Sequence, residues 1–525
     1  MQSMTPAVED APPIEDEART GRRAWLQQAA ALAAGAAATP LLPREAGAQT
    51  KSARYGGLLG QLGQQASWRS LEARLVRRSG FGITPADFSH ARTLGYQAYL
   101  EEQLAWESID DRGCDDHLAA AYATFFRLTI PQAIAFANAN NSNFTVVSPA
   151  QRIAVERAIL SKRQLLEQMV EFWRDHFNVY VWSAFSLQPW HERSVIRPHA
   201  LGTVGALVRA SMRSPAMLHY LDQPLNTRWG INENYARELM ELHTVGVTGG
   251  YSQRDVYELA RVLTGWTIDQ TGAFQYRADN HDFGPKSVFG LEFPGASRGS
   301  GTQGMEEAIA FGEHLIRHPK TREYIATKLL KWFITPTPTD GQIRSVIDAY
   351  GTDGDIKAML RVVLAPANVM RAPAKLKRPF HYIVSAVRTT GGTVRPVVDF
   401  ARDNNGLGWA VGSLGHAPGG WQTPDGYPDR AEFWAGGIIE RWNVIQWLIQ
   451  DRSTGNGTVI TDFSRFAGNG TIDGVVQQIN AGMLGGEMSL ALADELRAVL
   501  RSGVTTARIQ TAVRLALMSP EFQFY

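Results

Sequence analysis

The densest group of polar side chains in this chain lies in residues 232–247, which read Asn-Glu-Asn-Tyr-Ala-Arg-Glu-Leu-Met-Glu-Leu-His-Thr-Val-Gly-Val. On a helix, Glu238 and Glu241 fall within one narrow arc, and Arg237 lies beside them. Two carboxylates on one helix face can bind a cation or carry out acid–base catalysis. Acidic and basic residues at i,i+4 spacing are equally typical of a solvated helix face. These residues alone leave both interpretations open.

Motifs that the sequence lacks argue against several other classes of enzyme. It contains no His-Glu-x-x-His motif, no Gly-x-Ser-x-Gly motif and no glycine-rich phosphate loop after a strand. Its one cysteine, Cys114, excludes an intramolecular disulfide and a thiolate metal cluster. The 52 basic and 51 acidic residues give a net charge of +1, which argues against a nucleic-acid-binding protein.

The elements that must position these residues are predicted from the spacing of apolar side chains. It indicates a mainly α-helical, large multi-helix globular protein with a few short strands. Ser148-Pro149 is expected to begin a long helix that runs to about Asn178, and residues 272–277 are expected to form one strand of a small hairpin. Further helices are predicted at 194–212, 231–245, 252–264, 305–317, 320–333, 341–350, 354–364, 377–389, 431–450, 488–502 and 505–518. Long glycine- and proline-rich connections, which are often functional, lie at 246–251, 284–304 and 403–428.

The N-terminal segment has the composition of an export signal. Arg22 and Arg23 precede an apolar run from Ala29 to Leu42, and Ala46-Gly47-Ala48 has the pattern of a cleavage site. The arginine pair is similar to the twin-arginine type of signal. The alternative, a membrane anchor, is disfavoured because the run is short of the ~20 strongly apolar residues that a spanning helix needs. We therefore expect a periplasmic or secreted protein whose mature form does not span a membrane.

This N-terminus sets the expected domain organisation. Residues 1–48 are predicted to be the twin-arginine-type signal peptide and residues 49–69 a linker. Residues 70–525 are predicted to form the main domain, with a division into two lobes, 70–300 and 301–525, left open.

Several motifs along the chain together resemble one bacterial family. Besides the segment at 232–247, they include Phe-Trp-Arg-Asp-His-Phe at 172–177, Ala-Arg-Val-Leu-Thr-Gly-Trp at 260–266, His-Asp-Phe-Gly-Pro-Lys at 281–286 and Pro-Asp-Gly-Tyr-Pro at 424–428. Over roughly residues 70–525 the sequence resembles the family named "domain of unknown function 1800". The resemblance implies a large exported bacterial protein without an established activity. It also implies an exported partner protein, from a second uncharacterised family numbered 1501.

The resemblance groups further residues with the two glutamates, because Trp173, His176, His281 and Asp282 match the polar positions of the family. We hypothesise that side chains from distant segments converge on a divalent transition metal such as iron, manganese or zinc, with carboxylate and imidazole ligands. The proposed ligands are His176, Glu238, Glu241 and His281. The proposed catalytic residues are Glu238, Glu241, His281 and Asp282.

The alternative is a structural hydrogen-bond network. In that interpretation Arg237 pairs with the acids and Asn232 caps the helix. His243 falls on the apolar side of the same helix, at a position where the family also carries phenylalanine, so we expect it to be a core histidine.

Aromatic side chains suggest what a substrate would be. Trp421 follows Gly419-Gly420 and is expected in an exposed loop, where its ring can stack on a sugar. Trp173 and Arg237 are the other residues expected to contact a substrate. Because the charge is near neutral, a glycan is favoured over nucleic acid. The chain is thus predicted to be an exported enzyme, with a metal as the candidate cofactor, acting on cell-envelope or extracellular polymers. The alternative is a non-catalytic envelope scaffold or partner protein.

Overall fold

The computed structural model describes residues 68–297, 301–395, 406–449 and 459–525. The predicted signal peptide and the predicted linker up to residue 67 lie outside the described residues. Within those residues the chain is mainly α-helical with a few short strands, which confirms the predicted fold class. None of the described helices is both long and apolar enough to cross a bilayer.

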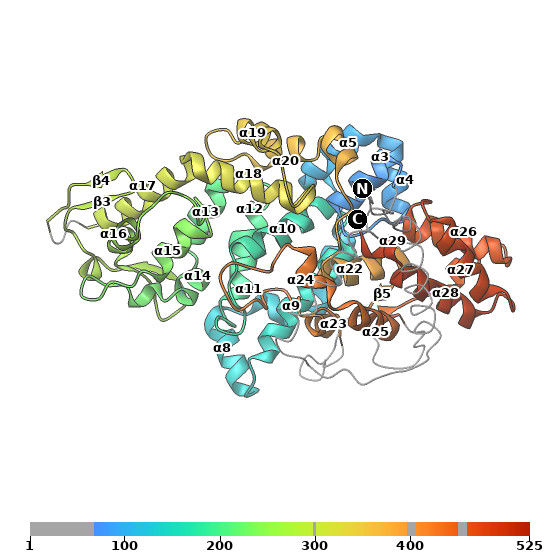
Figure 1. The fold of residues 1–525 in the computed structure, drawn as a ribbon. Helices are drawn as coiled ribbons and strands as arrows, with labels where there is room; N and C mark the ends of the chain where they lie inside the picture. The colour runs from blue at the N-terminus through green and yellow to red at the C-terminus, as the bar shows by residue number, and fades with distance from the viewer. Residues whose placement is uncertain (1–67, 298–300, 396–405, 450–458) are drawn as a thin grey trace, which may run out of the picture.

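The helices build an elongated body (Figure 1). The N-terminal part forms α3 (Leu71–Ser79), α4 (Pro85–Leu94), α5 (Tyr96–Leu104), η1 (Trp106–Ser108), α6 (Arg112–Ala121), α7 (Ala123–Arg127), α8 (Ile130–Ala139), α9 (Phe144–Leu160) and α10 (Gln164–His176). The first half of the middle part forms α11 (Gln188–His191), η2 (Glu192–Ile196), α12 (Arg197–His199), α13 (Val204–Met212), α14 (Pro215–Tyr220), η3 (Gln223–Leu225), α15 (Asn234–Glu241), α16 (Gln253–Leu263) and η4 (Ala278–Asn280). Its second half forms α17 (Gln303–Arg317), α18 (Pro319–Phe333), α19 (Asp340–Asp348), α20 (Ile356–Val363) and α21 (Pro366–Arg371).

The C-terminal part completes the body. It forms α22 (Pro379–Thr390), α23 (Leu407–Ser413), α24 (Ala431–Ala435), α25 (Ile438–Leu448), η6 (Phe463–Phe466), α26 (Ile472–Leu484), α27 (Leu490–Leu500), α28 (Thr506–Met518) and α29 (Pro520–Gln523). In Figure 1, α14–α17 occupy one end of the molecule and α26–α28 the other, with α10 and α22 between them.

Three two-stranded antiparallel sheets supplement the helices. They pair β1 (Trp266–Ile268) with β2 (Phe274–Tyr276), β3 (Lys286–Val288) with β4 (Leu291–Phe293), and β5 (Thr393–Val394) with β6 (Val459–Ile460). The first pair confirms the hairpin predicted around residues 272–277. The strands are too short to form a layer of their own, so helix packing provides the core.

The helix expected from Ser148 to about Asn178 is two helices, α9 and α10. The first begins upstream, and Pro149 lies inside it. Ser161 ends it in an extended conformation, and its hydroxyl donates to Asp111 at 2.7 Å. The apolar periodicity continues across this break because both helices are buried, so spacing alone did not reveal it.

Buried apolar residues form two large clusters. The larger contains residues from Ala73 to Ala372, and the second combines Phe81 and α9 residues with residues from Phe380 to Phe522. A smaller cluster joins Trp68 to Tyr525, so the start and the end of the described chain lie together, as Figure 1 also shows. Clusters of buried residues do not by themselves define domains, so the division at residue 300 stays a prediction.

Candidate functional site

Helix α10 is the structural centre of the candidate site, and all of its residues are buried. It nevertheless carries many charged groups, and a buried charge is tolerated only with a partner. The carboxylate of Glu167 accepts hydrogen bonds from both terminal nitrogens of Arg197, at 2.7 and 2.8 Å. Arg174 binds Glu171 and also donates to Glu192 at 2.8 Å. The charged side chains of α10 can therefore be buried because oppositely charged groups, several of them from other segments, pair with them.

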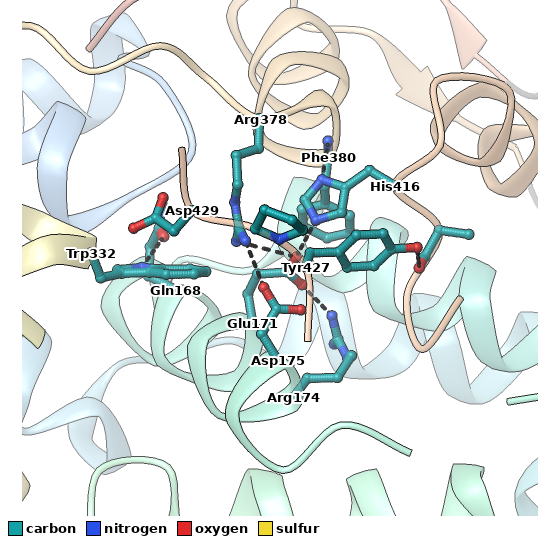
Figure 2. A network of polar contacts seen from close by, with 12 residues as sticks. Gln168, Glu171, Arg174, Asp175, Trp332, Arg378, Phe380, His416, Tyr427 and Asp429 are labelled. Atoms are coloured by element: carbon teal, nitrogen blue, oxygen red, sulfur yellow. Dashed lines mark hydrogen bonds and ion pairs between the residues drawn. The ribbon is translucent and has the colours of Figure 1, made fainter. Parts of the chain in front are cut away.

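Arg378, immediately before α22, closes this ion network from the other side (Figure 2). It donates to Asp175 at 2.5 Å, lies 3.7 Å from Glu171, and its guanidinium stacks on Trp332 at 4.0 Å. Burial raises the pKa of Glu171, and the neighbouring guanidinium of Arg174 opposes that effect. Two carboxylates and two guanidinium groups thus balance each other where α10 meets α22.

The network also contains the one group of potential metal ligands with atoms within 4.8 Å of one another in the described residues: Glu171, Asp175 and His416. The imidazole does not fit a metal. Nδ1 of His416 accepts the backbone N–H of Phe380 at 3.1 Å, so in the neutral ring Nε2 carries the proton. Burial lowers the pKa of His416 well below its usual value and keeps the ring neutral. A protonated Nε2, 3.5 Å from Glu171, offers that carboxylate a donor and no lone pair for a cation.

The segment 416–429 lies directly against the C-terminal end of α10. The amide of Asn178 donates to the carbonyl groups of Trp421 and Thr423, at 3.0 and 2.7 Å. Gly426 has a φ of +75°, and a Cβ there would lie 2.1 Å from the carbonyl oxygen of Asp175. Only glycine allows both the conformation and this approach. The Pro-Asp-Gly-Tyr-Pro motif is thereby fixed to the helix that carries the ion network.

Asp425 is an exposed residue of this segment, and its charge influences Glu238 on α15. Oδ1 of Asp425 accepts the indole N–H of Trp421 at 2.9 Å and the hydroxyl of Thr423 at 2.5 Å. Glu238 and Glu241, one turn apart on α15, face the same region, and we call these three carboxylates the outer acidic cluster. Partial burial, together with the charges of Glu241 and Asp425, raises the pKa of Glu238 to about 7, against the opposing charge of Arg237. Glu238 therefore holds a proton close to neutral pH.

Three tyrosines surround the outer acidic cluster. Tyr220 donates its hydroxyl to the carbonyl of Gln422 at 2.6 Å, which ties α14 to the 416–429 segment. Burial and the charge of Glu241 raise the pKa of Tyr251 to about 12. Burial and the charges of Asp425 and Glu241 raise the pKa of Tyr324 to about 12. The cluster is thus held between α14, α15, α18 and the 416–429 segment.

The predicted ligand His176 lies in the core behind Tyr324. Its ring is 6.0 Å from that of Tyr324, and its Nε2 donates to the backbone carbonyl of His243 at 3.0 Å. His243 is buried as well, which confirms it as a core histidine, and burial lowers its pKa to about 3. Both histidines belong to the support of the cluster.

His281 and Asp282 lie in a different place. Nδ1 of His281 donates to the carbonyl of Thr264 at 2.7 Å, and its Nε2 is 3.5 Å from Glu307. Asp282 accepts Nε of Arg261 at 2.7 Å. Both residues line an open cleft of about 500 Å³. The four predicted ligands His176, Glu238, Glu241 and His281 are therefore not brought together as a group.

The three predicted substrate residues have different environments. Trp173 is fully buried and donates its indole N–H to the carbonyl of Ala200 at 3.1 Å, which is a packing position. Arg237 pairs with Glu233 at 3.0 Å, the i,i+4 pair expected of a helix face. Trp421 is half-buried and holds Asp425 beside Glu238.

Asp425 and the three tyrosines were not singled out from the sequence. The Pro-Asp-Gly-Tyr-Pro motif was the signal that could have found Asp425, because Pro, Asp and Gly together mark a turn in a long, often functional connection. The tyrosines gave no such signal, because each comes from a separate helix or loop.

Comparison with known proteins identifies the family of the chain and no individual relative. No curated protein and no solved structure matched the chain significantly. The profile of one family matches residues 74–524, which include α10, α15 and the 416–429 segment. The chain therefore belongs to the family described as "Protein of unknown function (DUF1800)".

Proposed function

We propose that this protein is an exported enzyme that carries out acid–base chemistry at the outer acidic cluster, on a saccharide polymer of the cell envelope or the extracellular space. The observation that supports it is a half-buried Glu238 whose pKa is raised by burial and by the charges of Glu241 and Asp425, together with a tryptophan and a threonine that hold Asp425 in place. Two carboxylates in unequal environments are the arrangement by which many enzymes separate a general acid from a general base.

In this proposal Glu238 is the acid. Its pKa of about 7 leaves it protonated in part at neutral pH, so it can give a proton to the oxygen of a leaving group. Asp425 is the base. Its Oδ1 is occupied by two donors, whereas in the described residues its Oδ2 accepts no hydrogen bond and can accept a proton from water. Trp421 supplies an aromatic surface next to the base, as a sugar ring requires.

A metal is not needed for these steps. The three carboxylates of the outer acidic cluster are not among the residue groups whose ligand atoms lie within 4.8 Å in the described chain. We therefore expect activity to survive dialysis against a chelator. Activity that disappears in chelator and returns with one divalent metal would restore the metal hypothesis and replace ours.

The test is the release of reducing ends from a panel of envelope and extracellular polysaccharides by the purified mature chain. We expect Glu238→Gln and Asp425→Asn to lower the rate by about 10²–10⁴-fold. Glu233→Gln is the matched control. Glu233 lies just before the same helix, and its carboxylate pairs with Arg237. No release from any polymer, or full activity of Glu238→Gln, would reject the proposal.

The stability of the same two variants distinguishes the proposed enzyme from the alternative, a non-catalytic envelope scaffold. If the cluster were only a structural network, each substitution would destabilise the fold by about 1–3 kcal/mol. If the cluster is a functional site, removal of one carboxylate that is repelled by its neighbours leaves the free energy of unfolding unchanged or raises it.

A further inference from the structure

The cleft that contains His281 and Asp282 has a second wall that no sequence motif indicated. Arg228 and Trp229 lie at the tip of a tight turn closed by two hydrogen bonds between Thr227 and Gly230, each 3.0 Å long. The backbone N–H of Arg228 also donates to the carbonyl of Asn280 at 2.9 Å, so the turn is attached to the opposite wall. The two side chains are therefore held in place before any ligand arrives.

Trp229 has an unusual environment for a large aromatic residue. It is 68% exposed, whereas most large apolar side chains of the protein are buried. The guanidinium of Arg228 stacks on its ring at 4.3 Å. A tryptophan held in this way at the edge of a 500 Å³ cleft is available to a ligand.

The charge of the cleft is also uneven. Asp282 is neutralised by Arg261, whose hydrogen bond lowers the pKa of the carboxyl against the opposing effect of burial. Arg228 makes no ion pair with any carboxylate of the described chain, and its Nε is buried without a hydrogen-bond partner. A guanidinium without a carboxylate partner, facing a cleft, favours an anionic ligand that can accept two parallel hydrogen bonds.

We propose that this cleft binds an acidic saccharide, with a sugar carboxylate on Arg228 and the face of a sugar ring on Trp229. The inference rests on the proposed function for the class of ligand, a saccharide, and adds that the saccharide is anionic. The turn precedes α15 by a few residues, and Asn226 accepts the backbone N–H of Asn232 at 3.0 Å across that interval. This hydrogen bond fixes the path of the chain between the turn and α15.

The test is calorimetric titration of the mature protein with trigalacturonate and with its methyl ester, which has the same rings but no charge. We expect the acid to bind at least tenfold more tightly than the ester. Arg228→Gln should remove that preference, and Trp229→Ala should weaken both ligands at least tenfold. Trp182→Ala is the matched control, because Trp182 is also exposed but lies outside the cleft; it should bind as the unaltered protein does.

Each other outcome counts against the inference. No binding of either ligand, equal binding of acid and ester, or unaltered binding by Arg228→Gln would overturn it. Glu238→Gln separates this inference from the proposed function. We expect that variant to bind trigalacturonate normally, so a failure of catalysis and a failure of binding appear in different measurements.

Discussion

At the scale of single residues, the chemistry depends on a carboxyl group kept out of water. Glu238 is half-buried and has two carboxylates as neighbours, so its charged form is disfavoured in the folded protein. Its pKa is raised to about 7 from a reference of 4.5. The folded state therefore binds more protons than the unfolded state between these values, and stability falls as the pH rises through that range.

This sign gives a first prediction. Glu238→Gln should be as stable as the unaltered protein at pH 4 and more stable at pH 8, by about 1 kcal/mol after solvent screening is allowed for. Urea unfolding at both values measures the difference. A variant that is less stable at pH 8 would mean that Glu238 is paired rather than crowded.

A second residue, Gly426, positions Asp425 by its lack of a side chain. Gly426→Ala should destabilise the fold by about 2–4 kcal/mol, because a Cβ would meet the carbonyl of Asp175 in a strained conformation. Gly415→Ala, just before the 416–429 segment, is the control. It has the same φ of +75° but no atom within 4 Å of the added Cβ, so its cost should be about 1–2 kcal/mol. Equal losses in thermal denaturation would show that conformation alone matters.

At the scale of elements, the site depends on how α10, α22 and the 416–429 segment are joined. Arg378 neutralises Asp175 in the interior (Figure 2). We predict that Arg378→Met destabilises the fold by about 3–5 kcal/mol, because it leaves a buried carboxylate without a partner. Arg361→Met breaks an exposed pair with Glu101 and should cost less than about 1 kcal/mol. Similar losses for both variants in denaturant unfolding would contradict a structural role for the network.

At the scale of the whole molecule, export stays a prediction, because the segment that carries it lies outside the described residues. Substitution of both Arg22 and Arg23 by lysine should leave the precursor in the cytoplasm, since the arginine pair is the feature similar to a twin-arginine signal. Immunoblots of cell fractions measure the distribution. Arg19→Lys is the control, and export of the double variant at the normal level would mean that another route is used.

The sequence by itself determined the fold class, one strand of a small hairpin at 272–277, the core position of His243 and the family, because these follow from local periodicity and from contiguous motifs. It also pointed to Glu238 and Glu241 as neighbours, since i,i+3 residues on a helix always share a face. Only the tertiary structure decided what lies opposite them. Asp425 comes from a loop almost two hundred positions later, fixed there by the close approach of Gly426 to α10. His176 and His281 lie in other motifs of the same family, and they pack against Tyr324 and Thr264. Long-range packing, which no spacing encodes, sets where side chains on separate elements meet.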